Sequence, residues 1–195
     1  MTKAERTTRF IIERVSPIFN KKGVYGTSLN DLTEATGLTK GSIYGNFKNK
    51  DDLASSCFQY NLRFLQRGLY KSITLNGNAQ YKLQALIDFY REHFEEVSQN
   101  GGCPLMNTAI EADDGYPLLK AEVAQTFEQW RRELINILSQ SQLKGELDAN
   151  FNTERFANTL IAMIEGGILI AKSLNEPSHF FSIMDSLEEM VNQMN

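Results

Sequence analysis

The tetrapeptide Thr39-Lys40-Gly41-Ser42 carries the kinds of side chain that bind phosphate groups. Two hydroxyls and one ammonium stand on what would be the first turn of a helix, where the backbone N–H groups also favour phosphate. Lys48 and Lys50 follow closely and add two cations. These residue types at this spacing indicate contact with the backbone of a nucleic acid.

The distribution of charge favours the same interpretation. The chain of 195 residues has a formal net charge of −4, but residues 1–50 contain nine Lys and Arg against four Asp and Glu. The first part therefore carries +5, which leaves −9 for the other 145 residues. A basic end on an acidic body is typical of a nucleic-acid-binding module joined to another domain, although a solvated surface would show the same bias.

Two short helices are predicted to position these side chains. Ser28 and Asp31 have the spacing of a capping box, which begins a helix that Gly37 ends. Thr39 then caps a second helix that runs to about Phe47. Two helices of about nine residues, joined by a short link with glycine, are typical of a helix-turn-helix, whose second helix enters the DNA major groove. On spacing alone, a helical hairpin with a solvated basic face is the alternative.

The second of these helices has an apolar and a polar side. Ile43 and Phe47 lie four residues apart, so they would pack it against the preceding helix. The polar side chains are then freer to face outward: Lys40, Ser42, Tyr44 and Asn46.

Helical patterning covers the rest of the chain, so we expect an all-α fold. A first helix with a kink at Pro17 is predicted to end at Gly23. A fourth helix over residues 50–70 would connect an N-terminal domain, residues 1–50, to a larger helical domain, residues 51–195. No run of alternating β-branched residues predicts a sheet.

The last two predicted helices have heptad-like apolar stripes. The first of them is apolar on two adjoining faces, so it must be covered twice, by its own core and by a partner. Such a helix beside a one-stripe helix is what a four-helix interface between two copies would need. We therefore expect a homodimer formed through Phe156, Leu160, Met163, Gly167, Ile170, Leu174, Phe180, Met184, Leu187 and Val191.

Thr8 to Leu53 resembles the DNA-binding domain of the TetR family (TetR/AcrR type) of bacterial transcriptional regulators. The family pattern has a first helix ending in Phe-x-x-x-Gly-aromatic, then Thr-Thr/Ser, a short helix, and a recognition helix ending in Tyr-x-x-Phe. In this chain the aromatic stands one place later, at Tyr25. The matching segments are Phe19–Ser28, Leu38–Phe47 and Lys50–Leu53. Gly45 and Asn46 stand where the family usually has Tyr and His. The remainder resembles the family's ligand-binding and dimerisation domain through Gly102-Cys103-Pro104-Leu105 and Glu165-Gly166-Gly167.

The resemblance implies a DNA-binding regulator: a repressor that binds a palindromic operator as a homodimer and is relieved by a small, mostly apolar effector. A helical interaction module with no sequence-specific DNA role is the alternative. The implied DNA contacts are Thr27, Ser28, Thr39, Lys40, Gly41, Ser42, Tyr44, Asn46, Lys48 and Lys50. By the same analogy, effector contacts are expected among Phe89, Tyr90, Phe94, Cys103, Met106, Phe127, Trp130 and Met163, for which core packing is the alternative.

Candidate catalytic and metal-binding groups are few. His93 and Glu96 are spaced i, i+3 and could form half of a di-metal site, but no second helix repeats the pair. Glycine-rich phosphate loops, His-Glu-x-x-His and nucleophile elbows do not occur. We therefore expect no enzyme activity, no metal and no cofactor. Without a stretch of signal-peptide or membrane-span length, we expect a cytoplasmic protein that does not enter a membrane.

The two cysteines are too few for a disulfide framework and lack zinc-site spacing. Cys103 follows two glycines and precedes Pro104, so we expect it in a turn with an accessible thiol, unlike Cys57 on an apolar helical stripe. Oxidant or electrophile sensing by Cys103 is one hypothesis. The nearby charges in sequence are acidic or absent, which favours an ordinary thiol pKa and a packing role.

Overall fold

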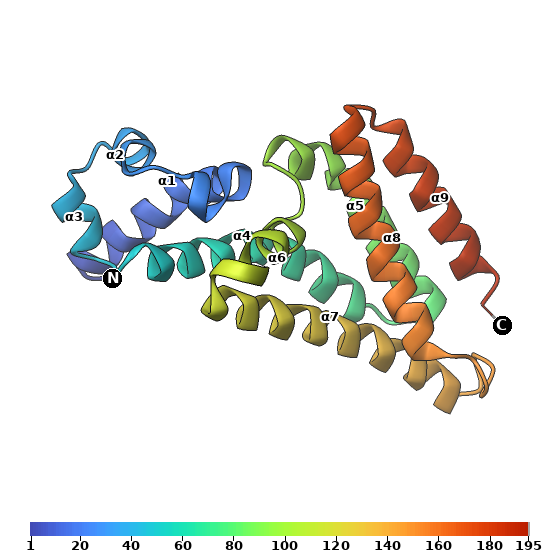
Figure 1. Cartoon of the computed structure of the whole chain (residues 1–195). Coiled ribbons are helices and arrows are strands. Elements are labelled where there is room, and N and C mark those ends of the chain that lie inside the picture. The colour runs from blue at the N-terminus through green and yellow to red at the C-terminus, as the bar shows by residue number, and fades with distance from the viewer. Residues whose placement is uncertain (195) are drawn as a thin grey trace. The chain divides into compact units, whose positions relative to one another are not determined.

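The computed structural model describes residues 1–194, with the backbone alone at Asp114. All regular elements in this range are α-helices, which confirms the predicted all-α fold (Figure 1). In chain order they are α1 (Lys3–Gly26), α2 (Leu29–Thr36), α3 (Lys40–Tyr44), α4 (Lys50–Ile73), α5 (Ala79–Gln99), α6 (Pro104–Gly115), α7 (Pro117–Leu143), α8 (Thr153–Leu174) and α9 (Ser178–Asn192).

The helices form two compact units. The first contains residues 1–64 and 100–124, and the second contains residues 65–99 and those from 125 onward. Helix α6 therefore belongs to the same unit as α1, although it follows α5 of the second unit in the sequence. The predicted division into residues 1–50 and 51–195 does not follow these units. It stays a prediction of which residues bind DNA and which bind the effector and the partner chain.

Helix α1 is broken at Gly23 rather than at Pro17. The backbone angles stay helical through Pro17, whereas Gly23 has φ +74° and ψ 173°. A side chain would be strained at this positive φ, so the position requires glycine. The backbone break therefore lies six residues after Pro17, where the kink predicted from the sequence stays a prediction, and one further helical turn, Val24–Gly26, follows the break.

Helices α2 and α3 form the predicted helix-turn-helix. The Ser28 hydroxyl accepts a hydrogen bond from the Asp31 N–H (3.2 Å), and the Asp31 carboxylate accepts one from the Ser28 N–H (2.7 Å). Gly37 ends α2 with φ +66°, and the Thr39 side chain caps α3. The capping box, the glycine turn and the second cap are thus confirmed.

Helix α3 has five residues, fewer than the nine or so predicted. In a continued helix the Ser42 carbonyl oxygen would accept the backbone N–H of Asn46. Instead the Asn46 side-chain Nδ2 donates to that oxygen (2.8 Å), and the Asn46 backbone N–H bonds to the Ile43 oxygen (3.0 Å). Asparagine competes with the helical backbone in this way, so α3 ends early.

The helix-turn-helix has its own small core with α1. The Lys22 ammonium of α1 lies 2.5 Å from the Asp31 carboxylate of α2. This hydrogen bond, with further ones from Ser28, holds the pKa of Asp31 well below its usual range. The core side chains are buried and include the predicted pair, of which Ile43 belongs to α3 and Phe47 follows it: Ile11, Val15, Leu32, Ile43 and Phe47.

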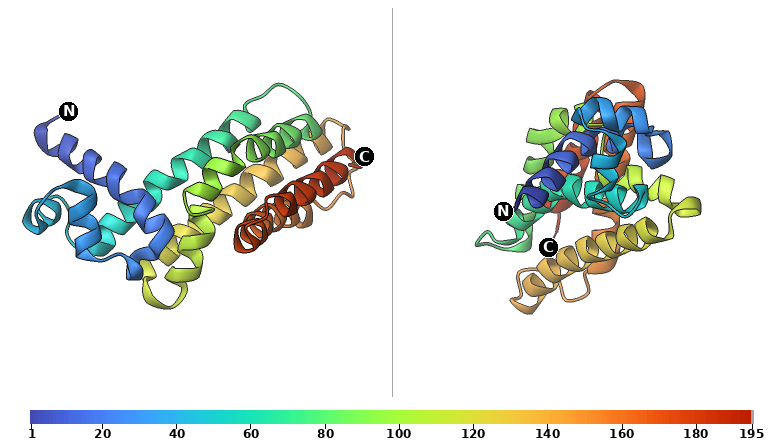
Figure 2. Two further views of the ribbon diagram at one scale, coloured as in Figure 1. Left: turned by 90° about the horizontal axis from the view of Figure 1, so that it is seen from above. Right: turned by 90° about the vertical axis from the view of Figure 1, so that its left-hand side faces the viewer.

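In the second unit α8 and α9 form a hairpin that packs against α5 (Figure 2). Arg91 of α5 forms ion pairs with Asp185 and Glu188 of α9, each at 2.6 Å. By length and composition α8 is apolar enough to cross a membrane, but core helices of soluble proteins meet the same criterion. Nine residues of α8 are buried within the unit, so its apolar character has a packing explanation.

Candidate nucleic-acid interface

The accessible surface of the helix-turn-helix is polar and basic. Because Ile43 and Phe47 are buried, the intervening polar side chains are turned outward to differing degrees. Tyr44, Asn46 and Lys50 are half-buried. The predicted DNA-binding residues that are exposed are Ser28, Thr39, Lys40, Gly41, Ser42 and Lys48.

The first turn of α3 presents two hydroxyls side by side. The Thr39 hydroxyl accepts the Ser42 N–H at 3.2 Å, and the two side-chain oxygens lie 3.1 Å apart. A Cβ at Gly41 would meet only the Thr39 oxygen, at 4.0 Å, so packing within the chain does not require glycine there. Because Gly41 has no side chain, a large ligand can come close to the backbone at this position.

Thr27 does not belong to this surface. Its side chain is fully buried, and its hydroxyl donates to the Gly23 carbonyl oxygen at 2.6 Å. A phosphate group does not reach a buried hydroxyl, so the predicted side-chain contact from Thr27 is wrong. Ser28 is the exposed member of this pair.

Asn46 connects α3 to the beginning of α1. The Thr8 hydroxyl donates to Asn46 Oδ1 at 3.1 Å, while Asn46 Nδ2 donates to the Ser42 carbonyl oxygen. Both ends of the amide are thus engaged within the chain. Thr8 is not among the residues predicted from the sequence, because no local pattern indicates a contact across 38 residues.

Two family models match the chain. Residues 11–57 match the model described as bacterial regulatory proteins, tetR family, and residues 79–187 match a tetracyclin repressor-like C-terminal domain. The second match alone covers more than half of the chain. The chain belongs to the TetR family.

Related proteins and structures extend over nearly the whole length of this TetR-family protein. The HTH-type transcriptional repressor DhaR of Mycobacterium sp. (strain GP1) is 25% identical over 162 residues, 83% of this chain and 80% of that protein. A TetR-family regulator from Cytophaga hutchinsonii is 34% identical with a TM-score of 0.89, covering 100% of this chain and 98% of the other. A TetR regulator from Chloroflexus aurantiacus is 28% identical with a TM-score of 0.92 over the same shares. The predictions of a DNA-binding transcription regulator and of a helix-turn-helix are confirmed.

Several residues predicted to contact an effector lie next to one another in the second unit. The Tyr90 ring centroid lies 5.6 Å from that of Phe89 and 6.3 Å from that of Trp130. Phe94 instead stacks on Phe180 of α9, with centroids 4.3 Å apart. The Trp130 indole N–H is buried and has no hydrogen-bond acceptor among the residues that the structure describes. Phe127 and Met163 are half-buried in this unit, whereas Cys103 and Met106 belong to the first unit.

The two thiols are both inaccessible. Cys103 directly precedes α6 and is fully buried, so the expectation of an accessible thiol is wrong. Cys57 is also fully buried, and burial raises its pKa to about 12. Thiol oxidation requires access and thiolate character, so the sensing hypothesis for Cys103 gains no support.

His93 contacts its own helix. Its Nδ1 lies 2.8 Å from the Phe89 carbonyl oxygen, and the two rings have centroids 4.5 Å apart. Among the described residues, no three His, Cys, Asp or Glu side chains are grouped in a way that could hold a metal ion.

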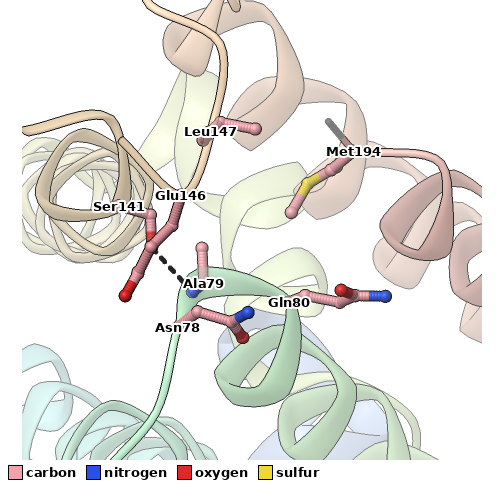
Figure 3. A pocket seen from close by; sticks show the side chains of 7 residues that line it. All are labelled: Asn78, Ala79, Gln80, Ser141, Glu146, Leu147 and Met194. Atoms are coloured by element: carbon pink, nitrogen blue, oxygen red, sulfur yellow. Dashed lines mark hydrogen bonds between the residues drawn. The ribbon is translucent and has the colours of Figure 1, made fainter. Parts of the chain in front are cut away.

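A small pocket of the second unit lies where α5 begins (Figure 3). Ser141 accepts the Ala79 N–H at 2.8 Å and donates to Glu146 at 3.0 Å. The pocket has a volume of about 20 Å³, which is enough for roughly one water molecule. This pocket is therefore too small for the expected effector. Its lining is Asn78, Ala79, Gln80, Ser141, Glu146, Leu147 and Met194.

Most residues predicted to form the dimer interface are buried within a single chain. A Cβ at Gly167 would lie 3.3 Å from Phe180 and 3.4 Å from Ile183, so this glycine permits close approach of α8 and α9 in one protomer. The predicted contact of these residues with a partner is therefore wrong: Phe156, Leu160, Gly167, Phe180, Met184, Leu187 and Val191. Ile170 and Leu174 are exposed, and Met163 is half-buried.

Because Thr8 and Asn46 share a hydrogen bond, we expect them to act on DNA binding as one unit. Thr8→Val and Asn46→Ala should each lower operator affinity by about 2- to 10-fold, and the double variant should lose little more than either single one. Thr7→Val is the control, because the Thr7 hydroxyl donates only within α1, to the Lys3 carbonyl oxygen. Fluorescence anisotropy with labelled operator DNA measures the effect. Fully additive losses would show that Asn46 contacts DNA independently of Thr8.

Proposed function

We propose that the protein is a cytoplasmic repressor that binds a palindromic operator as a homodimer and leaves it when a small, mostly apolar effector binds. The observation that carries this proposal is the exposed set of hydroxyl and lysine side chains on and after α3, held by a helix-turn-helix with its own core. The description of the relative DhaR as a repressor supports the direction of regulation.

The exposed and half-buried residues of this surface divide into two roles in this proposal, contact with bases and contact with phosphates. Lys40 and Gly41, on the first turn of α3, approach base edges in the major groove. Ser42 lies on the same turn. Phosphate contacts come from residues at the ends of the two helices and beyond α3, and they set the register without selecting a sequence. These residues are Ser28, Thr39, Tyr44, Lys48 and Lys50.

Binding-site selection from random DNA should yield a palindrome whose half-site centres lie ~34–36 Å apart or a multiple of that distance. Lys50→Ala should weaken binding to every sequence and reduce the slope of log K against log salt by about 0.9, because one phosphate contact is lost. Lys144→Ala, which removes an exposed lysine of the second unit, is the control. Selection without any enriched sequence would favour the interaction module that has no sequence-specific DNA role.

The homodimer needs a surface that the single chain leaves uncovered. A palindrome has two half-sites and each chain has one helix-turn-helix, so two copies must be joined. We propose the outer face of α8, where a Cβ at Gly166 would have nothing within 4 Å. The apolar and small residues of this face are Ala162, Met163, Gly166, Leu169, Ile170 and Leu174.

Gly166→Trp should convert the dimer to a monomer, because a large side chain would hold the two copies of α8 apart. Gly166→Ala should remain dimeric, since a methyl group fits the open space and alanine favours the helix. Sedimentation velocity distinguishes the two species, and circular dichroism checks that both variants fold. A dimeric Gly166→Trp variant would place the interface on another surface.

The effector proposal rests on the second unit. Tyr90 and Trp130 are aromatic neighbours there, and the unpaired indole N–H of Trp130 would be satisfied by a ligand that carries a hydrogen-bond acceptor. An effector that binds the DNA-free conformation better must lower operator affinity by the same factor by which DNA lowers effector affinity. A coupling typical of allosteric proteins would change both affinities by about 5- to 150-fold.

Trp130 is the only tryptophan of the chain, so its fluorescence reports on this region. The probe 1-anilinonaphthalene-8-sulfonate, an aromatic anion whose sulfonate oxygens are hydrogen-bond acceptors, should receive energy transfer from Trp130 and lower operator affinity. Trp130→Phe should bind the probe more weakly, because it lacks the N–H. An operator affinity that is unchanged when the probe is bound would contradict the proposed linkage.

A further inference from the structure

The carboxylate of Glu111 on α6 forms two short hydrogen bonds to the end of α1. Its Oε2 accepts the Val24 N–H at 2.6 Å, and its Oε1 accepts the Tyr25 N–H at 2.5 Å. All three residues belong to the first unit, and Glu111 is half-buried. Each carboxylate oxygen of Glu111 thus accepts one backbone N–H of the same helical turn.

These N–H groups need an acceptor because of the break in α1. A helix leaves the first N–H groups of each new segment without helical partners. The turn Val24–Gly26 is such a segment, since Gly23 before it is not helical. A carboxylate is the strongest acceptor among protein side chains for N–H groups at this position, because its charge also favours the positive end of a helical turn.

Gly23 and Glu111 fit one another sterically. A Cβ at residue 23 would lie 2.7 Å from Glu111 Oε2 and 2.8 Å from Oε1, closer than carbon and oxygen atoms approach. Gly23 also has the positive φ that favours glycine. The absence of a side chain therefore serves both the break in the helix and the approach of the carboxylate.

A second set of hydrogen bonds joins the same two helices. Asn107 Nδ2 on α6 lies 3.1 Å from the Asn20 carbonyl oxygen and 2.9 Å from that of Gly101. Asn20 Nδ2 on α1 donates to the carbonyl oxygens of Asn100 (2.7 Å) and Gly102 (3.0 Å). Helix α1 is therefore held by α6 and the turn before it on both sides of the break.

The helix-turn-helix begins directly after this point. The Thr27 hydroxyl bonds back to Gly23, and α2 begins at Leu29. We propose that Glu111 is a positioning residue for DNA binding: by fixing the turn Val24–Gly26 against α6, it sets the direction in which α2 and α3 leave α1. Glu111 itself does not contact DNA in this proposal, which rests on the proposed function only where operator affinity is the readout.

Glu111→Gln tests the proposal with little change in size. One acceptor oxygen becomes an NH₂ group that faces an N–H, so one of the two hydrogen bonds is lost. Hydrogen exchange of the Val24 and Tyr25 amides, measured without DNA, should become at least about tenfold faster, and operator affinity should fall by about tenfold. Glu111→Asp, which keeps the charge but has a shorter reach, should behave in the same way.

Glu122→Gln is the matched control. The Glu122 carboxylate also accepts two hydrogen bonds in the first unit, from Ser55 (2.6 Å) and Gln59 (2.9 Å), but both come from α4. This variant should leave the exchange of Val24 and Tyr25 and the operator affinity unchanged, while urea unfolding shows how much stability each variant loses. Unchanged exchange in Glu111→Gln, or faster exchange with wild-type operator affinity, would overturn the proposal. Wild-type protein that selects no operator would contradict the proposed function instead, because the exchange measurement needs no DNA.

Discussion

The backbone break at Gly23 is the constraint on which the DNA-binding half of the protein depends. Breaking a helix leaves N–H and C=O groups without partners, and half-buried groups of this kind must be satisfied elsewhere. The structure supplies the Glu111 carboxylate for two N–H groups and the Thr27 hydroxyl for the Gly23 carbonyl oxygen. These bonds replace regular helical ones, so the chain can turn toward α2 without losing hydrogen bonding.

Features whose partners lie within a few residues could be predicted from the sequence. Ser28 and Asp31 cap one another three residues apart, Gly37 turns the chain by its own φ, and Thr39 caps the helix that follows it. The buried positions of Ile43 and Phe47 follow from helical spacing in the same way. Local physics therefore gives the helix-turn-helix, and the matching family model extends over these residues.

Features that depend on distant partners could not be predicted. Asn46 lies on the polar side of the predicted helix, which suggested solvent exposure. Its side chain instead bonds to Thr8, which is 38 residues away in the sequence. Gly166 and Gly167 are adjacent in a helix that is apolar on two faces, and periodicity does not tell which face meets α9 of the same chain. Cys103 lies in a glycine-rich turn, but its fully buried position is set by tertiary packing. In each case the sequence gives the residue type, and only packing decides its surroundings.

The shortness of α3 limits how much DNA sequence one protomer can recognise directly. Five residues rise only about 7.5 Å along the helix axis, which is close to the height of two base pairs at ~3.4 Å each. In the proposed complex the remaining selectivity comes from DNA whose groove width and bending suit the spacing of the proposed phosphate contacts. A few bases in each half-site should therefore be strictly required, and the positions between them should tolerate exchanges that preserve the shape of the duplex.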